Sequence, residues 1–216
     1  MLSFRPGSNI GLKLNNLRYS KHWVPRLILW TFESRNDSLI AGDSVFCHNY
    51  AVKPIFIVMG VSGCGKTTLA QVLAGKSGAH CFDADDFHPP ANKAKMAAGI
   101  PLTDADRWPW LDILHAELQA IAAREESVFL ACSALKQSYR DRLVQGLMQA
   151  RFVYLRGSFE VIQARLLARR NHFMPAGLLE SQFAILEEPG DAIILDASHS
   201  ISQLVDDFQK ATTTFS

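Results

Sequence analysis

Short apolar runs alternate with helical patterns along residues 53–216. Alternation of this kind is typical of β-α units stacked around a mainly parallel sheet, so we expect one doubly wound α/β domain here. The predicted strands are 55–59, 79–83, 127–132, 151–156 and 192–196. The predicted helices are 66–76, 109–123, 137–148, 159–169, 178–186 and 201–213.

The helical pattern is clear over residues 109–123. Apolar side chains recur on one face of this segment, which we expect to pack against the sheet: Trp110, Ile113, Leu114, Leu118 and Ile121. Just upstream, Thr103 and Asp106 have the spacing of a capping box, which is a signal for the start of a helix.

Residues 1–52 look unlike the rest of the chain. Basic residues occur from Arg5 to Arg26 before the first acidic residue, Glu33, and no long apolar period is visible. The apolar stretch 27–32 is far shorter than the about 20 residues that cross a bilayer, and no signal-peptide cleavage pattern follows it. An organelle transit peptide, a disordered tail and translated upstream sequence all fit this composition, and we favour the last two. We therefore predict a cytoplasmic protein with an N-terminal extension over 1–52, outside the core, and one domain over 53–216.

The composition favours a small soluble ligand. The 216 residues include 22 Lys+Arg against 21 Asp+Glu, so no basic field is present to recruit nucleic acid or an anionic membrane. The cysteines at 47, 64, 81 and 132 contain no C-x-x-C pair, which argues against a zinc site or a disulfide framework.

Residues 60–67, GVSGCGKT, match the phosphate-binding pattern G-x-x-x-x-G-K-[ST] directly after the apolar run 55–59. Glycines let the backbone turn so that its N–H groups converge on phosphate oxygens, and the dipole of the following helix adds to this attraction. Lys66 would carry its charge to the β and γ phosphates of ATP, and Thr67 would offer a hydroxyl to Mg²⁺. The alternative is a glycine turn without a nucleotide. The predicted nucleotide-binding residues are Gly60, Val61, Ser62, Gly63, Cys64, Gly65, Lys66, Thr67 and Thr68.

Cys64 allows two interpretations within this loop. A thiolate is favoured near a helix N-terminus, so oxidation of Cys64 could block the nucleotide. We favour the simpler alternative, in which Cys64 is a small spacer whose side chain points away from the phosphates.

Two aspartates lie at the carboxyl end of the predicted strand 79–83. Asp83 and Asp85 are two residues apart, so in extended geometry both could face one side and approach Mg²⁺ and an acceptor hydroxyl. The runs 127–132 and 151–156 end at Cys132 and Arg156 instead, which makes Asp83 the candidate metal ligand. The alternative is that these aspartates only cap the following turn or helix, a role that fits Asp86 better.

Three segments after the glycine loop, together with a later fourth one, carry a family resemblance. They are FDADDFHPPANKAKM, PLTDADRWPWL, ACSALKQSYRDRL and HFMPAGLLESQFAILEEP. In this order and spacing they resemble the gluconokinase family, a branch of small kinases related in fold to shikimate kinase, over about residues 55–195. The resemblance implies a P-loop kinase, a three-layer α/β/α sandwich with a mainly parallel five-stranded sheet and a mobile lid. It also implies ATP-dependent phosphorylation of D-gluconate to 6-phosphogluconate, which feeds the pentose phosphate pathway.

The resemblance also implies roles for individual residues. Asp83 supports magnesium through water, Asp85 meets the sugar hydroxyl, and Ser133 adds a hydroxyl contact. Cys64 is a departure, because the family commonly has serine at this place in the loop. It does not threaten the phosphate chemistry.

The sequence ARLLARRNHFMP suggests a lid. Arg165 and Arg169 are four residues apart on one helical face, and the loop that follows could close over the site, exclude water and bring arginines onto the phosphoryl group. By resemblance, both arginines bind ATP phosphates and His172 lies in the lid near the substrate. The expected catalytic residues are thus Lys66, Asp85 and Arg169.

A substrate with a carboxylate, such as gluconate, also needs cations near it. Arg107, Lys136 and Arg140 lie on loops or helix starts that follow predicted strands. Arginine binds a carboxylate bidentately and lysine binds it as a point charge. Taken singly, each of the three could instead be a solvated surface charge.

Three other functions stay open. Shikimate kinase shares the fold and the paired aspartates, although ACSALK replaces the glycine-rich turn expected there. A GTPase is disfavoured because residues 92–95, NKAK, lack the aspartate of a guanine-reading N-K-x-D. A non-catalytic ATP-binding module is disfavoured by the candidate base and the lid arginines.

Related kinases often form homodimers, but no interface signature is visible.

Overall fold

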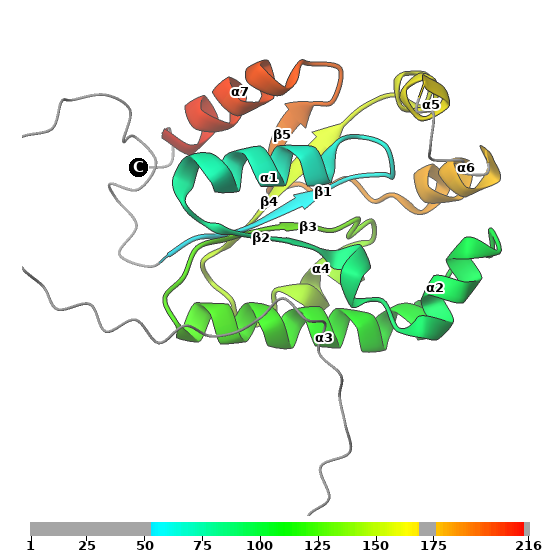
Figure 1. The fold of residues 1–216 in the computed structure, drawn as a ribbon, viewed down its shortest axis with the longest axis horizontal. Coiled ribbons are helices and arrows are strands. Elements are labelled where there is room, and N and C mark those ends of the chain that lie inside the picture. The colour runs from blue at the N-terminus through cyan, green and yellow to red at the C-terminus, as the bar shows by residue number, and fades with distance from the viewer. Residues whose placement is uncertain (1–52, 169–175, 214–216) are drawn as a thin grey trace, which may run out of the picture. The chain divides into compact units, whose positions relative to one another are not determined.

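The computed structural model of this chain describes residues 53–168 and 176–213 (Figure 1). The elements lie close to the predicted ones, with boundary shifts of a few residues and two additions. In chain order they are β1 (Ile55–Met59), α1 (Lys66–Ser77), β2 (His80–Asp83), the 3₁₀ helix η1 (Ala84–Phe87), α2 (Pro90–Ala97), α3 (Asp104–Ala123), β3 (Val128–Ala131), α4 (Gln137–Leu143), β4 (Ala150–Arg156), α5 (Phe159–Ala168), α6 (Ala176–Ile185), β5 (Ile193–Asp196) and α7 (Ile201–Thr213).

The five described strands form one parallel sheet in the order β2-β3-β1-β4-β5. β1 is buried along its whole length, because it lies in the centre with neighbours on both sides. Its side chains alternate between the faces: Ile55, Ile57 and Met59 join one apolar cluster, while Phe56 and Val58 join the other. An unbroken apolar run is therefore what this position in the sheet requires.

Helices cover both faces of the sheet (Figure 1). α1 and α7 pack on one face, where Leu69, Leu73 and Phe208 contribute to the core. α3 and α4 pack on the other face, where Leu111 and Leu143 are fully buried. The described residues thus form the predicted three-layer α/β/α sandwich. None of their helices combines the length and the apolar character needed to cross a bilayer.

The strand order opens a crevice at one edge of the sheet. β1 and β3 are neighbours, but the chain leaves β1 into α1 on one face and leaves β3 toward α4 on the other face. The two loops therefore diverge at the carboxyl ends of the strands, which is where α/β proteins of this kind bind ligands.

Helix α3 differs from the prediction at its start. It begins at Asp104 instead of residue 109, and Pro109 lies inside it. The predicted capping box is confirmed: the side chain of Thr103 accepts from the backbone N–H of Asp106, whose side chain accepts from the backbone N–H of Thr103.

The predicted buried face of this helix is wrong at one position. Ile113 is 45% exposed, whereas Leu111, which we did not predict, is fully buried. Three other departures are η1 and α2, which the prediction lacks, and α4, which ends at Leu143 rather than at residue 148. Gly146, just beyond α4, has a φ of 75°, a left-handed conformation that does not continue a helix.

Two alanine substitutions test the observed face of α3. Leu111→Ala should lower the free energy of unfolding by about 2–5 kcal/mol, because it leaves a cavity between helix and sheet. Ile113→Ala should lower it by about 1 kcal/mol or less, because much of that side chain is already in water. Chemical denaturation of both variants measures the difference. Equal losses would contradict the placement of these two residues.

Candidate functional site

A cavity of about 510 Å³ lies at the carboxyl ends of β1, β2 and β3. Its wall combines the glycine loop, the aspartates Asp83 at the end of β2 and Asp85 in η1, the segment after β3, the start of α3 and parts of α5 and α6. The polar residues that line it are Ser62, Lys66, Thr67, Asp83, Asp85, His88, Asp104, Arg107, Ser133, Lys136, Ser181 and Gln182.

The glycine loop has the backbone that the motif requires. Gly60 has a φ of 137°, and a Cβ there would lie 2.9 Å from the carbonyl oxygen of Leu155 on β4. Gly65 has a φ of 108° and caps the N-terminus of α1. Both positions need glycine, because other residues rarely adopt these angles. The loop thus brings its backbone and the first turn of α1 to the cavity wall, an arrangement suited to phosphate.

The side chains of the loop divide between cavity and core. Ser62, Lys66 and Thr67 line the cavity, and Nζ of Lys66 donates to the carbonyl oxygen of Val61 at 3.1 Å. Val61 and Cys64 are buried in the core. Burial raises the pKa of the Cys64 thiol, so its placement fits the spacer interpretation and not the reactive thiolate.

Asp83 links the loop to the end of β2. Its Oδ2 accepts a hydrogen bond of 2.7 Å from Oγ1 of Thr67, and its Oδ1 accepts one of 3.0 Å from the backbone N–H of Asp85. Asp83 therefore also caps η1. Capping was the alternative to metal binding in the sequence analysis, and Asp83 makes this contact as well as the one to Thr67. The two oxygens of Thr67 and Asp83 suit Mg²⁺, which is commonly held by one or two protein oxygens with phosphates and water. No group of three or more His, Cys, Asp or Glu side chains suited to a metal occurs in the described part of the chain.

Asp85 points into the cavity near this link. Its side chain is 82% exposed at the mouth of the cavity. Partial desolvation at the cavity wall and the charge of Asp83 raise the pKa of its carboxyl, and Lys66 opposes the increase. Lys66 and Asp85 line the same cavity. A carboxyl with a raised pKa is a better proton acceptor, which suits a general base.

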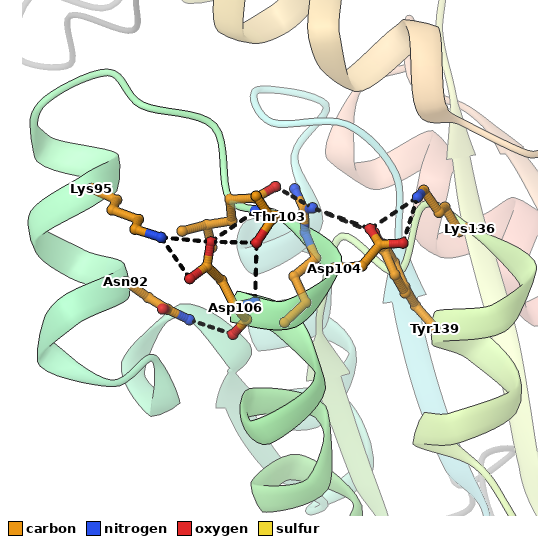
Figure 2. A network of polar contacts seen from close by, with 9 residues as sticks. Asn92, Lys95, Thr103, Asp104, Asp106, Lys136 and Tyr139 are labelled. Atoms are coloured by element: carbon orange, nitrogen blue, oxygen red, sulfur yellow. Dashed lines mark hydrogen bonds and ion pairs between the residues drawn. The ribbon is translucent and has the colours of Figure 1, made fainter.

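A second group of charges lies where α3 and α4 begin. Asp104 accepts hydrogen bonds from Nζ of Lys136 at 2.9 and 3.0 Å and from the hydroxyl of Tyr139 (Figure 2). These contacts, that of Tyr139 first, lower the pKa of Asp104. Arg107 lies beside them, with Nη1 at 4.0 Å from Oδ1 of Asp104 and bonded to the carbonyl oxygen of Leu102. Two cations and one carboxylate therefore meet at this end of the cavity.

Asp106 ties α2 to the start of α3. Its carboxylate accepts from Nζ of Lys95 at 2.7 and 2.9 Å and from the hydroxyl of Thr103 at 2.8 Å (Figure 2). Its backbone carbonyl accepts from Nδ2 of Asn92 at 2.8 Å. Both Lys95 and Asn92 come from α2, so polar contacts position this helix against the cavity.

Arg140 is not brought into the cavity. It is only 2% exposed, and its guanidinium donates to the carbonyl oxygens of Ala134 and Leu135 and to the side chain of Gln137. The expectation that it binds substrate is therefore not met by its position. It stabilises the turn that leads into α4.

The lid residues are described only in part. Nη1 of Arg165 donates to the carbonyl oxygen of Cys64 at 3.5 Å, so this arginine lies against the glycine loop. Arg169 and His172 lie outside the described residues. Thr68 lies in the first turn of α1.

The sequence did not identify His88, Asp104 or Gln182 as site residues. Gln182 on α6 accepts from the backbone N–H of Ser62 at 2.7 Å and donates to its hydroxyl at 3.0 Å. All three lie within the segments that carry the family resemblance. None of the three belongs to a motif that indicates a site by itself. They reach the cavity only through the fold.

Comparisons with known proteins agree with this geometry. The AAA domain family matches residues 55–189. The chain is 48% identical over 152 residues to the probable gluconokinase of Mus musculus, a match that covers 62% of this chain and 83% of that protein. It is 42% identical over 160 residues to the thermosensitive gluconokinase of Escherichia coli, covering 72% of this chain and 86% of that protein.

Solved structures also resemble this chain. A gluconokinase from Sinorhizobium meliloti has a TM-score of 0.68 at 38% identity, covering 76% of this chain and 94% of its own. An unliganded sugar kinase from Janibacter sp. has a TM-score of 0.69 at 46% identity, covering 73% and 93%.

The parallel sheet, the glycine loop after β1 and the link between Thr67 and Asp83 define a P-loop kinase. Within this class the matches are specific. The chain belongs to the gluconokinase family, which confirms the resemblance seen in its sequence.

The network around Asp106 predicts a pH dependence of stability. The hydrogen bond from Lys95, followed by those from Thr103, lowers the pKa of Asp106 from 3.8 to about 2. A carboxyl whose pKa is lower in the folded state stabilises the protein above its unfolded pKa and loses this effect as the pH falls through the folded value. Chemical denaturation should therefore show the wild type more stable than Asp106→Asn above about pH 5, with the difference shrinking between about pH 4 and pH 2. A difference that does not change with pH would contradict this role.

Proposed function

We propose that this protein is a gluconokinase, which transfers the γ-phosphoryl group of ATP to a hydroxyl of D-gluconate and yields 6-phospho-D-gluconate and ADP. One observation carries the proposal: a single cavity joins a phosphate-binding loop, the carboxylate of Asp85 and a pair of cations, Arg107 and Lys136. The relatives at 42–48% identity are gluconokinases by name, and they supply the identity of the acceptor.

The phosphate end of the cavity holds ATP in this proposal. Backbone N–H groups of the loop and the charge of Lys66 face the phosphate oxygens, and Arg165 lies close enough to the loop to join them. Thr67 and Asp83 would hold Mg²⁺, which when bound neutralises charge on the phosphates. By the family resemblance, Arg169 would bind the phosphates and His172 would lie near the acceptor.

Asp85 is the general base. It accepts the proton of the acceptor hydroxyl as that oxygen forms its bond to phosphorus and the bond to the leaving ADP oxygen breaks. The raised pKa of its carboxyl favours this transfer. Much of the remaining catalysis comes from positioning and charge neutralisation.

Arg107 and Lys136 hold the carboxylate of the sugar acid. Asp104 already offsets part of their charge, so this end of the cavity carries about one net positive charge, which matches a monocarboxylate. Ser133, on the same wall, offers its hydroxyl to the acceptor. Arg140 is left out of this set, because its donors are engaged elsewhere.

The family match begins at residue 55, which supports a kinase domain over 53–216 and an extension over 1–52 that is not needed for the reaction. We place the protein in the cytoplasm, as in the sequence prediction. Pairing into a homodimer stays a prediction.

An assay of ADP release with gluconate, shikimate and other polyols tests the function and the role of Asp85 together. The wild type should respond to gluconate, and Asp85→Asn should lower kcat by about 10²- to 10⁴-fold while ATP still binds, because only proton transfer is lost. Asp86→Asn, an exposed neighbour outside the cavity wall, is the matched control and should keep its activity. Shikimate-dependent release would indicate a shikimate kinase, and ATP binding without any turnover would indicate a binding module.

A second assay tests the acceptor end. Lys136→Met should raise the KM for gluconate by about 10- to 100-fold and leave the KM for ATP unchanged, because a charge-assisted hydrogen bond to the substrate is lost. Lys76→Met, an exposed lysine in the last turn of α1, should change neither constant. A rise in the KM for ATP alone would place Lys136 on the nucleotide instead.

A further inference from the structure

His88 is held in a single orientation at the wall of the cavity. It follows η1, and its side chain is only 4% exposed. Its ring stacks on Trp110, with the ring centroids 4.2 Å apart and the planes inclined by 15°. Trp110 is in turn fixed by a 2.8 Å hydrogen bond from its Nε1 to the carbonyl oxygen of Ala84. Neither ring can turn without breaking this packing.

The contacts of His88 define which ring nitrogen carries the proton. Nδ1 lies 3.4 Å from Nδ2 of Asn92, which also donates to the carbonyl oxygen of Asp106 at 2.8 Å. A carbonyl oxygen accepts only, so this atom of Asn92 is the amide nitrogen and Nδ1 of His88 is an acceptor. The proton of a neutral imidazole is then on Nε2. The Nε2 atom lies 3.9 Å from Oδ1 of Asp85.

The surroundings of His88 keep the ring neutral. Burial lowers its pKa to about 4, and the positive charges of Lys93 and Arg107 act in the same direction. At neutral pH the ring can therefore donate a hydrogen bond to Asp85 without adding a positive charge, which would weaken Asp85 as a base.

We propose that His88 is a positioning residue, which holds the carboxylate of Asp85 toward the acceptor hydroxyl through a hydrogen bond donated by Nε2 of its ring. This inference rests on the proposed function, in which Asp85 is the base. The distance of 3.9 Å is longer than a hydrogen bond, but bonds between catalytic groups often become shorter only when substrate is bound. The backbone of Asp85 is already anchored by Asp83, so a small rotation of its side chain is enough.

Three substitutions separate this role from simple packing. His88→Gln can place an amide N–H near the position of Nε2, whereas His88→Asn reaches only the position of Nδ1, and His88→Phe keeps the stacked ring without a donor. We expect His88→Gln to keep kcat within about 5-fold, and the other two to lower it by about 10- to 100-fold with the KM for ATP unchanged, as for a lost hydrogen bond to a charged group. Thermal unfolding of each variant reports any loss of packing. If the Phe variant folds poorly, the Gln and Asn variants can still be compared, because both carry a side-chain amide.

The same substitutions in an Asp85→Asn background test whether His88 acts through Asp85. Because both residues belong to one interaction, His88→Asn should cause little further loss of kcat there. Equal loss in the Gln and Asn variants, full activity in the Asn variant, or additive loss in the double variant would overturn the proposal. These outcomes differ from failure of the proposed function, in which the wild type releases no ADP with gluconate or Asp85→Asn alone stays fully active.

Discussion

The hydrogen bond from Thr67 to Asp83 joins two parts of the sheet that are not neighbours. Thr67 follows β1 and Asp83 ends β2, while β3 lies between these strands. The contact is possible because all strands are parallel, so their carboxyl ends meet at one edge. It holds the first turn of α1 against the start of η1. The contact therefore also fixes the distance between the phosphate loop and Asp85. The chemistry proposed for the cavity depends on that distance.

Features with a strong local signal could be predicted from the sequence. The glycine loop, the apolar run of β1 and the capping box at Thr103 are each defined by a few neighbouring residues. α2 has no such signal, because PANKAKMA lacks an apolar period and is held by polar contacts of Asn92 and Lys95 instead. The sequence pattern also failed to predict that Leu111 is buried on α3 and Ile113 is not. Which of the two is buried depends on how the helix lies on the sheet.

In the candidate site, the sequence alone does not show which of two similar side chains faces the cavity. Lys136 and Arg140 are cations four residues apart, and in sequence they look equivalent. In the fold, Lys136 is the N-cap of α4 and lines the cavity, whereas Arg140 lies one turn further and bonds back to the loop that precedes it. Which of them can reach a substrate depends on the direction of α4. That direction is set by packing of Tyr139 and Leu143 under the sheet.

The acceptor side of the cavity is positioned by polar contacts more than by apolar packing. Asp106 accepts from Lys95 and Thr103, its carbonyl accepts from Asn92, and Asn92 determines which nitrogen of His88 can donate. Apolar contacts are non-directional, so packing alone could hold the ring of His88 in place but could not select its protonated nitrogen. Each hydrogen bond contributes only about 0.5–1.5 kcal/mol to stability. Its larger effect here is orientation, because these contacts fix which ring nitrogen of His88 faces Asp85.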